Sequence, residues 1–496
     1  MKKRVCLVIL DGWGISSREE GNAIRQAYTP NFERLWLTYP HAVLEASGKA
    51  MGLPKGQMGT SEIGHMTMGS GRIMFQDLVK ISQAIETGEF FKNREIVKLM
   101  NQVKKNNATL HLMGLVSDGG VHAHYAHLYA LLKMAKDRGL KKVGVHVFTD
   151  GRDCKIKSGL GFVEDLSEYM KGLGVGEIVS ISGRYFAMDR DHNWGRTDRA
   201  YKMMTGKRRI IKKTAVQVIK DAYEKGITDE FIKPVMIKNR QIRQADGAIF
   251  FNFRNDRPRQ LLERFLSKGP KGVSWLTMTR YKPDYPVRVV YPPEELKQIL
   301  GEIISRAGLK QLRVTETEKF AHLTFFFNGK QEEPFEKEDR ILLDSNSDIS
   351  THDQKPQMRA EAIGEEVVQA MANKTHEAII TNLCNADMIG HTANLEAAIK
   401  GVEVIDKVLG RMENAAKQNN YDLMITADHG NAEAMIDEKT KEKLTAHTIN
   451  SVPFILVSRQ FKQLKQEEGS LVNIGPTILK ILRLKQPSEM TGQSLV

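Results

Sequence analysis

The sequence predicts an α/β protein with two domains, one of them discontinuous. Short apolar runs typical of buried strands alternate with helix-like segments along the chain. The 496 residues exceed what one hydrophobic core normally supports. A proline-punctuated stretch at residues 280–300, RYKPDYPVRVVYPPEELKQIL, interrupts the alternation and marks a domain boundary.

The apolar run at residues 4–10 is expected to be the first buried strand. Its basic start imitates a secretory signal, but the run is too short and meets Asp11 instead of a small-residue cleavage site. No segment of the sequence is expected to span a membrane. Later strands often end on Asp, Ser, Gly or Asn, where α/β sheets carry their ligands. They are expected at 109–116, 143–150, 177–183, 247–253, 377–382, 421–428 and 451–457.

Two helices have clear signals. Thr29 precedes Pro30, which suits the first position of a helix. From Asn394 to about Lys417, apolar residues recur at spacings of three and four, which predicts a long helix with one face in the core.

The domain boundaries follow from pairing the two ends of the chain. If the N-terminal strand and loop join the late part, the middle is an insertion. The expected domains are a metal domain formed by residues 1–75 and 292–496, and an inserted substrate domain at 76–291.

The basic composition points to anionic partners. The formal net charge is +13 and the sequence pI is about 9.3. However, the densest basic cluster, GKRRIIKK at 206–213, has no interleaved aromatic residues, and no zinc-finger, RRM or KH pattern is present. Nucleic acid is therefore not an expected partner. Single arginines inside TDGRDC, SGRYFAMDRD and FFNFRNDRP better suit a small phosphorylated ligand.

The cysteines point to a reducing compartment. Their number is three, and they form no C-x-x-C pair, which argues against a disulfide framework and against a thiolate metal site. A cytoplasmic location is expected.

Carboxylates and imidazoles gather in three late strings, CNADMIGHTAN, ITADHGNAE and TAHTINSVP. Such a set without thiolates is typical of a metal site. Five candidates are too many for one four-coordinate ion and suggest two ions, as in many phosphoryl-transfer sites. The candidates are Asp387, His391, Asp428, His429 and His447, with Asp11 as a sixth ligand.

Ser61 lies in the glycine-broken loop PKGQMGTSEIGH. Loop serines usually cap helices, so this stretch alone favours a turn residue. Two cations beside the hydroxyl would lower its pKa and hold it as an alkoxide. The metal candidates therefore make Ser61 a candidate nucleophile.

Ten strings together resemble cofactor-independent phosphoglycerate mutase and occur in that family's order, from about Lys3 to the C-terminal EMTGQSLV. They are LDGWG, GQMGTSEIGH, SDGGVHAH, TDGRDC, SGRYFAMDRD, FNFRNDR, TETEKFAH, NADMIGH, TADHGNAE and TAHT. The resemblance implies an alkaline-phosphatase-like metal domain interrupted by an α/β phosphotransferase domain. It also implies interconversion of 3-phosphoglycerate and 2-phosphoglycerate in glycolysis and gluconeogenesis, without 2,3-bisphosphoglycerate, through a phosphoserine on Ser61.

The resemblance also implies two manganese ions, although the donor set alone permits zinc or cobalt. Asp387, His391 and His447 would hold one ion, and Asp11, Ser61, Asp428 and His429 the other. The implied substrate contacts are His122, Arg152, Asp153, Arg184, Arg190, Arg254, Arg257 and Lys319.

Physical roles can be given to these contacts. Arg254, Arg257 and Lys319 suit a transferring phosphoryl group. Arg184, Arg190 and His122 suit the carboxylate and hydroxyls of glycerate. Of Arg152 and Asp153, one can orient glycerate while the other exchanges a proton with its O2 or O3. One departure is Thr60, which stands where the family commonly has Asn.

Three alternatives remain open from the residues. The metal and serine motifs would also serve a phosphomonoesterase or a phosphopentomutase of the same superfamily. The basic balance leaves a nucleic-acid-binding protein as the third. A small-molecule enzyme acting as a monomer is the expectation.

Overall fold

The computed structural model describes residues 3–206, 210–293 and 295–496. The chain divides into two compact units: unit 1 combines residues 1–75 with 295–496, and unit 2 is residues 76–294. The sequence places these boundaries at 75/76 and 291/292. Part of the basic cluster at 206–213, residues 207–209, lies outside the described residues.

Unit 1 is built on a mixed sheet. In the described part of this unit the sheet has eight strands, in the order β11-β10-β12-β1-β13-β14-β2-β15. Only the pairs of β14 with β13 and with β2 are antiparallel among these strands. The strands are β1 (Val5–Leu10), β2 (His41–Glu45), β10 (Gln311–Glu316), β11 (Glu338–Leu343), β12 (Ala378–Leu383), β13 (Asp422–Thr426), β14 (Val452–Val457) and β15 (Glu468–Ser470).

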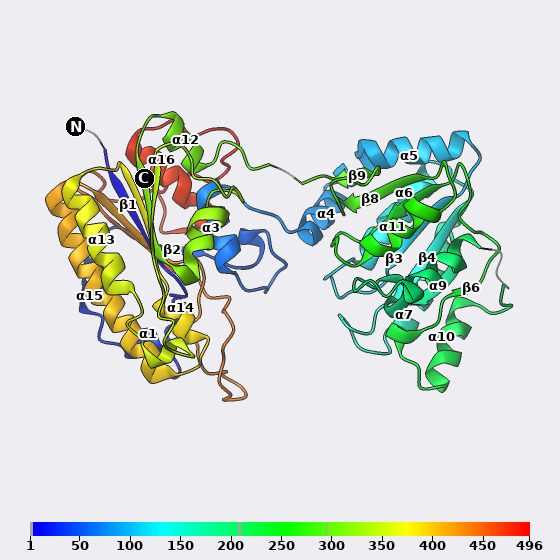
Figure 1. Ribbon diagram of the computed structural model, residues 1–496, viewed down its shortest axis with the longest axis horizontal. Helices are drawn as coiled ribbons and strands as arrows, with labels where there is room; N and C mark the ends of the chain where they lie inside the picture. Colours follow the sequence, from blue (N-terminus) through cyan, green and yellow to red (C-terminus); the bar gives the residue numbers. More distant parts are fainter. Residues whose placement is uncertain (1–2, 207–209, 294) are drawn as a thin grey trace. The chain divides into compact units, whose positions relative to one another are not determined.

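Helices cover both faces of this sheet (Figure 1). On one face α13 packs against α15 and against β10 and β12, while α16 contacts β1 and α12 contacts β10 from the other face, where α3 lies. The apolar residues of β1 are all buried in the resulting core. The helices of unit 1 are α1 (Ala23–Gln26), α2 (Pro30–Thr38), α3 (Ser61–Ser70), α12 (Leu300–Arg306), α13 (Ala360–Asn373), α14 (Asn385–Gly390), α15 (Leu395–Asn419) and α16 (Ile474–Leu482).

Unit 2 has its own sheet and core. In its described residues the sheet has seven strands in the order β6-β5-β4-β3-β7-β8-β9, and only β5 and β6 pair antiparallel. The strands are β3 (Leu110–Leu115), β4 (Val143–Thr149), β5 (Glu177–Gly183), β6 (Val235–Met236), β7 (Gly247–Phe250), β8 (Ser274–Thr279) and β9 (Arg288–Tyr291). The helices are α4 (Asp77–Glu86), α5 (Arg94–Lys105), α6 (Tyr125–Asp137), α7 (Gly159–Leu173), α8 (Arg184–Ala187), α9 (Trp194–Thr205), α10 (Ala215–Glu224) and α11 (Pro258–Lys268).

The eight strands expected from apolar runs are all confirmed, as β1, β3, β4, β5, β7, β12, β13 and β14. The two expected helices are α2 and α15; the side chain of Asn394 caps α15 by accepting a hydrogen bond from Ala397 N. The less apolar strands were missed. In β10 the buried Arg313 interrupts the apolar pattern, and its guanidinium donates to Gln311.

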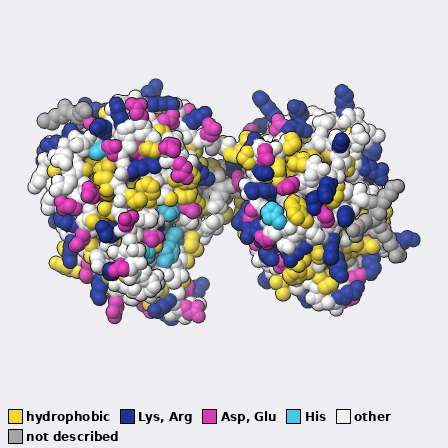
Figure 2. Space-filling view, viewed as in Figure 1, with side chains coloured by type: hydrophobic (Ala, Val, Ile, Leu, Met, Phe, Trp, Pro, Cys, Tyr) yellow, Lys and Arg dark blue, Asp and Glu magenta, His cyan; other side chains and the backbone are white. Residues whose placement is uncertain are grey.

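No helix in residues 3–206, 210–293 or 295–496 is long and apolar enough to cross a membrane. On the face shown in Figure 2, Lys and Arg side chains are interspersed with Asp and Glu on both units. The excess of positive charge is thus distributed among opposite charges on this face.

Candidate active site

The polar loops of unit 1 meet because their strands are neighbours. β1 lies between β12 and β13 and runs parallel to both, with Ile9 opposite Asn382 and Thr426. The carboxyl ends of parallel strands meet at one edge of a sheet, where ligands bind in α/β folds. Asp11 follows β1, Asp387 follows β12 within α14, and Asp428 follows β13. The antiparallel β14 begins at this edge, which brings His447 there as well.

Two glycines permit the close approach of these loops. Gly12 has φ of +76°, and a Cβ there would lie 2.7 Å from the Cα of Asp387. A Cβ at Gly64 in α3 would lie 2.8 Å from the Cβ of Asp428. Any larger residue would therefore separate the loops or push α3 away from Asp428.

Ser61 begins α3, and the Thr60 side chain caps that helix by accepting a hydrogen bond from Ile63 N at 3.4 Å. Thr60 therefore acts here as an ordinary N-cap. The buried hydroxyl oxygen of Ser61 lies 2.9 Å from His429 Nε2 and 3.4 Å from Asp11 Oδ1. The loop serine is thus a helix-start residue whose side chain points into the cluster.

Lys319 follows β10 in a short 3-10 helix, Thr317–Lys319, and is buried. Its Nζ lies 2.7 Å from Ser61 Oγ, 2.8 Å from Asp11 Oδ1 and 2.7 Å from Asp387 Oδ2. Burial alone would lower the pKa of Lys319, but the carboxylates of Asp11 and Asp387 outweigh it and raise the pKa above its usual value. Lys319 therefore stays charged and offsets two buried anions.

His391 and His447 converge on Asp387. His391 caps the C-terminus of α14, four residues after Asp387, and the Nε2 atoms of both histidines lie 3.2 Å from Asp387 Oδ1. The two Nε2 atoms are 3.2 Å apart. Their other ring nitrogens face main-chain oxygens, Thr445 O at 2.6 Å and Gly59 O at 2.9 Å, which fixes both rings.

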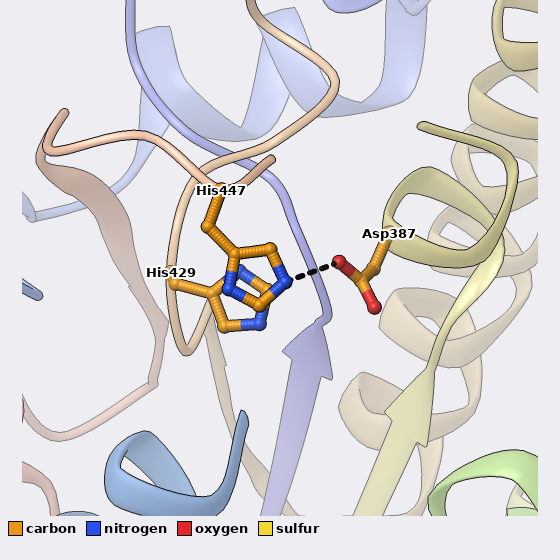
Figure 3. Close-up of side chains that lie close together, drawn as sticks. All are labelled: Asp387, His429 and His447. Atoms are coloured by element: carbon orange, nitrogen blue, oxygen red, sulfur yellow. Dashed lines mark ion pairs between the residues drawn. The ribbon is translucent and has the colours of Figure 1, made fainter. Parts of the chain in front are cut away.

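His429 links two groups of possible metal ligands. Among the described residues, ligand atoms of Asp387, His429 and His447 lie within 4.8 Å of one another, and so do those of Asp11, Asp428 and His429. Figure 3 shows the rings of His429 and His447 stacked, with His447 directed at Asp387; the ring centroids are 3.7 Å apart. The resemblance assigned His429 to the second ion alone, whereas here its ring borders both groups.

The electrostatics of Asp11 and Asp428 suit a bound cation. Burial raises the pKa of Asp11, and the neighbouring Asp428 carboxylate raises it further. For Asp428, burial is outweighed by His429 and His65, and the pKa lies well below its usual range. The buried Asp428 Oδ2 accepts no hydrogen bond, although His65 Nδ1 and His429 Nε2 lie 3.3 and 3.5 Å from it. Carboxylate and imidazole donors of this kind fit a divalent transition metal.

Unit 2 gathers the predicted arginines around carboxylates. Arg184 Nη1 lies 2.6 Å from Asp150 Oδ1 and 2.7 Å from Asp153 Oδ2, and it is almost fully buried. Arg152 pairs with Glu230 at 2.6 Å. Asp150 and Glu230 were missed as site residues, although Asp150 directly follows β4 and the strand-end signal could have found it.

The carboxylate of Asp256 in unit 2 lies close to three more of the predicted site residues. Asp256 lies 2.6 Å from Arg190 Nη1, 3.3 Å from Arg254 Nε and 3.6 Å from His122 Nδ1. Burial, aided by the charge of Arg184, lowers the pKa of His122 to about 4, so this ring is neutral near pH 7. Asp256 was also missed, within the string FNFRNDR.

Arg257 completes this group. Its Nη1 donates to Met188 O at 3.3 Å. Burial lowers the pKa of Arg257, and the charges of Arg184, Arg190 and Arg152 lower it further. Guanidinium groups that repel one another in this way favour an anion among them.

Three kinds of comparison with known proteins point to one family, one of them over residues 81–283 and two over 99–100% of the chain. Residues 81–283 match the family model described as BPG-independent PGAM N-terminus. The chain is 47% identical to a 2,3-bisphosphoglycerate-independent phosphoglycerate mutase of Thermosynechococcus vestitus, over 99% of this chain and 95% of that protein. It is 45% identical to that of Clostridium acetobutylicum, over 100% and 99%. A crystal structure of Leishmania mexicana phosphoglycerate mutase at low cobalt concentration is similar with a TM-score of 0.56 and 28% identity, over 100% of this chain and 98% of that one.

Proposed function

The chain belongs to the family of 2,3-bisphosphoglycerate-independent phosphoglycerate mutases, isomerases of phosphoglycerate, and from this premise we propose that the phosphoryl group passes through Ser61. The reaction interconverts 3-phosphoglycerate and 2-phosphoglycerate. The observation that supports Ser61 is its environment: the hydroxyl oxygen is buried between Lys319 Nζ at 2.7 Å and His429 Nε2 at 2.9 Å. A cation and an imidazole at these distances favour the deprotonated oxygen.

In the proposed reaction Ser61 has already released its proton to solvent and reacts as an alkoxide. In the first half its Oγ bonds to phosphorus while the bond from phosphorus to O3 of glycerate breaks. Asp153 supplies the proton that O3 takes up. In the second half Asp153 accepts the proton of O2, O2 bonds to phosphorus and the bond from phosphorus to Ser61 breaks, which returns the Ser61 alkoxide and protonated Asp153. Lys319 stays beside the serine oxygen and offsets the charge that develops there.

Two Mn²⁺ ions are the proposed cofactors, with Zn²⁺ or Co²⁺ compatible with the same donors. When bound, such ions stabilise the serine alkoxide and the phosphoryl oxygens. Oxygen and nitrogen donors, together with Asp428 Oδ2, which accepts no hydrogen bond, support the assignment. The proposed ligands are Asp387, His391 and His447 for one ion and Asp11, Ser61, Asp428 and His429 for the other.

Unit 2 is proposed to bind the phosphoglycerate. Arg254 and Arg257 would contact the phosphoryl group, and the mutual repulsion around Arg257 supports an anion there. Arg184, Arg190 and neutral His122 would hold glycerate, while Arg152 orients it beside Asp153. In this division of roles residues 76–291 form the phosphotransferase domain, and residues 1–75 and 292–496 form the metal domain. We propose a monomer that acts in the cytoplasm, where glycolysis and gluconeogenesis use this reaction.

The test is a coupled assay for 2-phosphoglycerate without added 2,3-bisphosphoglycerate. The parent enzyme should be active with Mn²⁺, inactive after EDTA treatment and active again when Mn²⁺ returns. Ser61→Ala should abolish turnover yet still bind Mn²⁺. Ser70→Ala is the matched control, since Ser70 is buried in the same helix and its hydroxyl donates to main-chain oxygens, Thr67 O and Arg72 O.

An active Ser61→Ala variant would exclude the phosphoserine scheme, and full activity after exhaustive chelation would exclude the two-metal scheme. Free phosphate in excess of 2-phosphoglycerate would favour the phosphatase alternative. Salt-dependent DNA binding by the parent enzyme would support a second, nucleic-acid-binding role.

A further inference from the structure

His65 lies one helical turn after Ser61, the proposed nucleophile, and no sequence motif assigns it a role. It follows Ser61 by four residues in α3, which places both residues on the same side of the helix. The ring is fully buried. Its nearest polar neighbours are Ser61 O at 2.8 Å, Asp428 Oδ2 at 3.3 Å and Asn382 Nδ2 at 3.1 Å.

These neighbours determine which ring nitrogen carries hydrogen. Nδ1 faces a carbonyl oxygen and a carboxylate oxygen, neither of which donates, so Nδ1 must be the donor. Nε2 is then free to accept, and the amide nitrogen of Asn382 faces it. The ring therefore donates a hydrogen bond through Nδ1 and accepts one through Nε2.

Asn382 extends the connection to the other carboxylate. It is fully buried in β12, and its amide nitrogen also lies 2.7 Å from Asp11 Oδ2. The two amide hydrogens thus have two acceptors, His65 Nε2 and Asp11 Oδ2. If the amide were turned over, its oxygen would face the Asp11 carboxylate, so the chain of donors has one consistent arrangement.

We propose that His65 and Asn382 are positioning residues that hold Asp11 and Asp428 in register with Ser61. The inference rests on the proposed function, in which these carboxylates are metal ligands. Asn382 secures Oδ2 of Asp11, so that Oδ1 faces Ser61 Oγ at 3.4 Å. His65 Nδ1 donates to the main chain at Ser61, and the same nitrogen lies 3.3 Å from Asp428 Oδ2. One hydrogen-bonded path therefore runs from Asp11 at the end of β1 through Asn382 and His65 to the start of α3, and the His65 ring borders Asp428 beyond the end of β13.

The physical need for such a path is clear from the charges. Asp11 and Asp428 are buried and raise each other's energy when both are ionised. The amide of Asn382 donates to Asp11 Oδ2 and stabilises that anion, while Asp11 Oδ1 stays directed at Ser61. Groups that orient metal-binding carboxylates in this way typically contribute about 10–100-fold to metal affinity or activity.

The variants follow from the geometry. His65→Gln can keep an acceptor near the Nε2 position but loses the Nδ1 donor, whereas His65→Asn keeps a donor near the Nδ1 position. Asn382→Leu removes both amide donors at similar volume. The control is His146→Gln in unit 2, where a fully buried histidine also has both ring nitrogens hydrogen-bonded, to His111 and Ser180.

The primary measurement is the Mn²⁺ dissociation constant of the chelated and reloaded proteins, by titration calorimetry. His65→Gln and Asn382→Leu should bind Mn²⁺ about 10–100-fold more weakly. His65→Asn should recover part of that loss. At saturating Mn²⁺, kcat should fall about tenfold or more while KM for 3-phosphoglycerate changes less than twofold, because all the proposed substrate contacts except Lys319 lie in unit 2.

Thermal unfolding of each variant separates positioning from folding. The control His146→Gln should lower the unfolding midpoint while Mn²⁺ affinity and kcat stay at parent values. Folded His65→Gln with unchanged Mn²⁺ affinity and kcat would overturn the proposal, and so would absence of Mn²⁺ binding by the parent. If His65→Gln does not fold, Asn382→Leu decides by the same criteria. Because affinity is measured without turnover, this result is independent of whether Ser61→Ala remains active.

Discussion

The ammonium of Lys319 lies 2.7 Å from the hydroxyl oxygen of Ser61, although 258 positions of sequence separate the two residues. The same ammonium contacts Asp11 and Asp387. Lys319→Met keeps an unbranched side chain, one atom shorter, but leaves these buried carboxylates without their cation. Removing one partner of a buried pair costs about 3–5 kcal/mol. We expect a loss of that order in the unfolding free energy of the chelated protein, measured by urea denaturation.

Mn²⁺ should stabilise Lys319→Met more than it stabilises the parent, because the ions then replace the missing charge. Turnover should nevertheless fall about 10²–10³-fold, as is usual when a group facing developing charge is removed. Lys400→Met, an exposed position on α15, is the control and should leave both properties unchanged. Equal stabilisation of the variant and the parent by Mn²⁺ would contradict this account of Lys319.

Sequence reasoning could find the members of this cluster because they follow strands. Asp428 comes soon after the apolar run of β13, and Asp11 directly follows β1. Asp387 and His391 are four residues apart, a spacing that can place two side chains on one helical face, and His391 Nε2 lies 3.2 Å from Asp387 Oδ1. Local patterns of this kind depend only on neighbouring residues.

Other members depend on tertiary contacts and carry no local signal. Asn382 lies in a buried strand, and its side-chain amide has a role because the fold places it between Asp11 and His65. The contact of Lys319 with Asp387 likewise requires that β10 and β12 be neighbours. Strand order could not be deduced from the apolar runs, because β10 was not recognised as a strand.

Glu433 forms hydrogen bonds to the loops that carry His429 and His447. Its buried carboxylate accepts hydrogen bonds from Gly14 N at 3.1 Å and Asn431 N at 2.8 Å, and from the side chains of Thr448 and Asn450. Glu433→Gln places an NH₂ group against donors, so at least one buried donor loses its acceptor. We expect the unfolding free energy to fall by about 1–3 kcal/mol, together with weaker Mn²⁺ binding.

Chemical denaturation and Mn²⁺ titration check the effect of Glu433. Glu438→Gln changes the same group at an exposed position five residues further along and should alter neither measurement. If Glu433→Gln matched the parent in unfolding free energy and in Mn²⁺ affinity, the carboxylate would not be the group that stabilises these loops.

Arg257 should contribute to substrate binding and not to metal binding. Its guanidinium stands among the charges of Arg184, Arg190 and Arg152, which the substrate anion would offset. A hydrogen bond to a charged group contributes about 1.5–3 kcal/mol, so Arg257→Ala should lower kcat/KM for 3-phosphoglycerate about 10–100-fold. Mn²⁺ affinity should not change.

Steady-state kinetics of Arg257→Ala should be compared with Arg259→Ala, two residues further along. Arg259 is also half-buried, but its Nε donates to Tyr281 O at 3.0 Å and it is not among the proposed contacts. Arg259→Ala should keep kcat/KM near the parent value. Equal losses in the two variants would argue against a specific phosphate contact at Arg257.

His127 should make the protein less stable in mild acid. Burial lowers the pKa of this histidine to about 3, and the nearby His124 adds to the effect. Unfolded histidines have a pKa of about 6.5, so the unfolded chain binds more protons between about pH 6.5 and 3. The stabilisation is therefore fully present above pH 6.5 and is lost as the pH falls through this interval.

A variant at this position tests the effect. The His127 ring contacts Ser82 Oγ at 3.0 Å, and His127→Gln keeps a polar partner there but cannot be protonated. Urea denaturation of the chelated protein at several pH values should show a smaller loss of unfolding free energy for His127→Gln than for the parent; parallel profiles would show that His127 does not contribute.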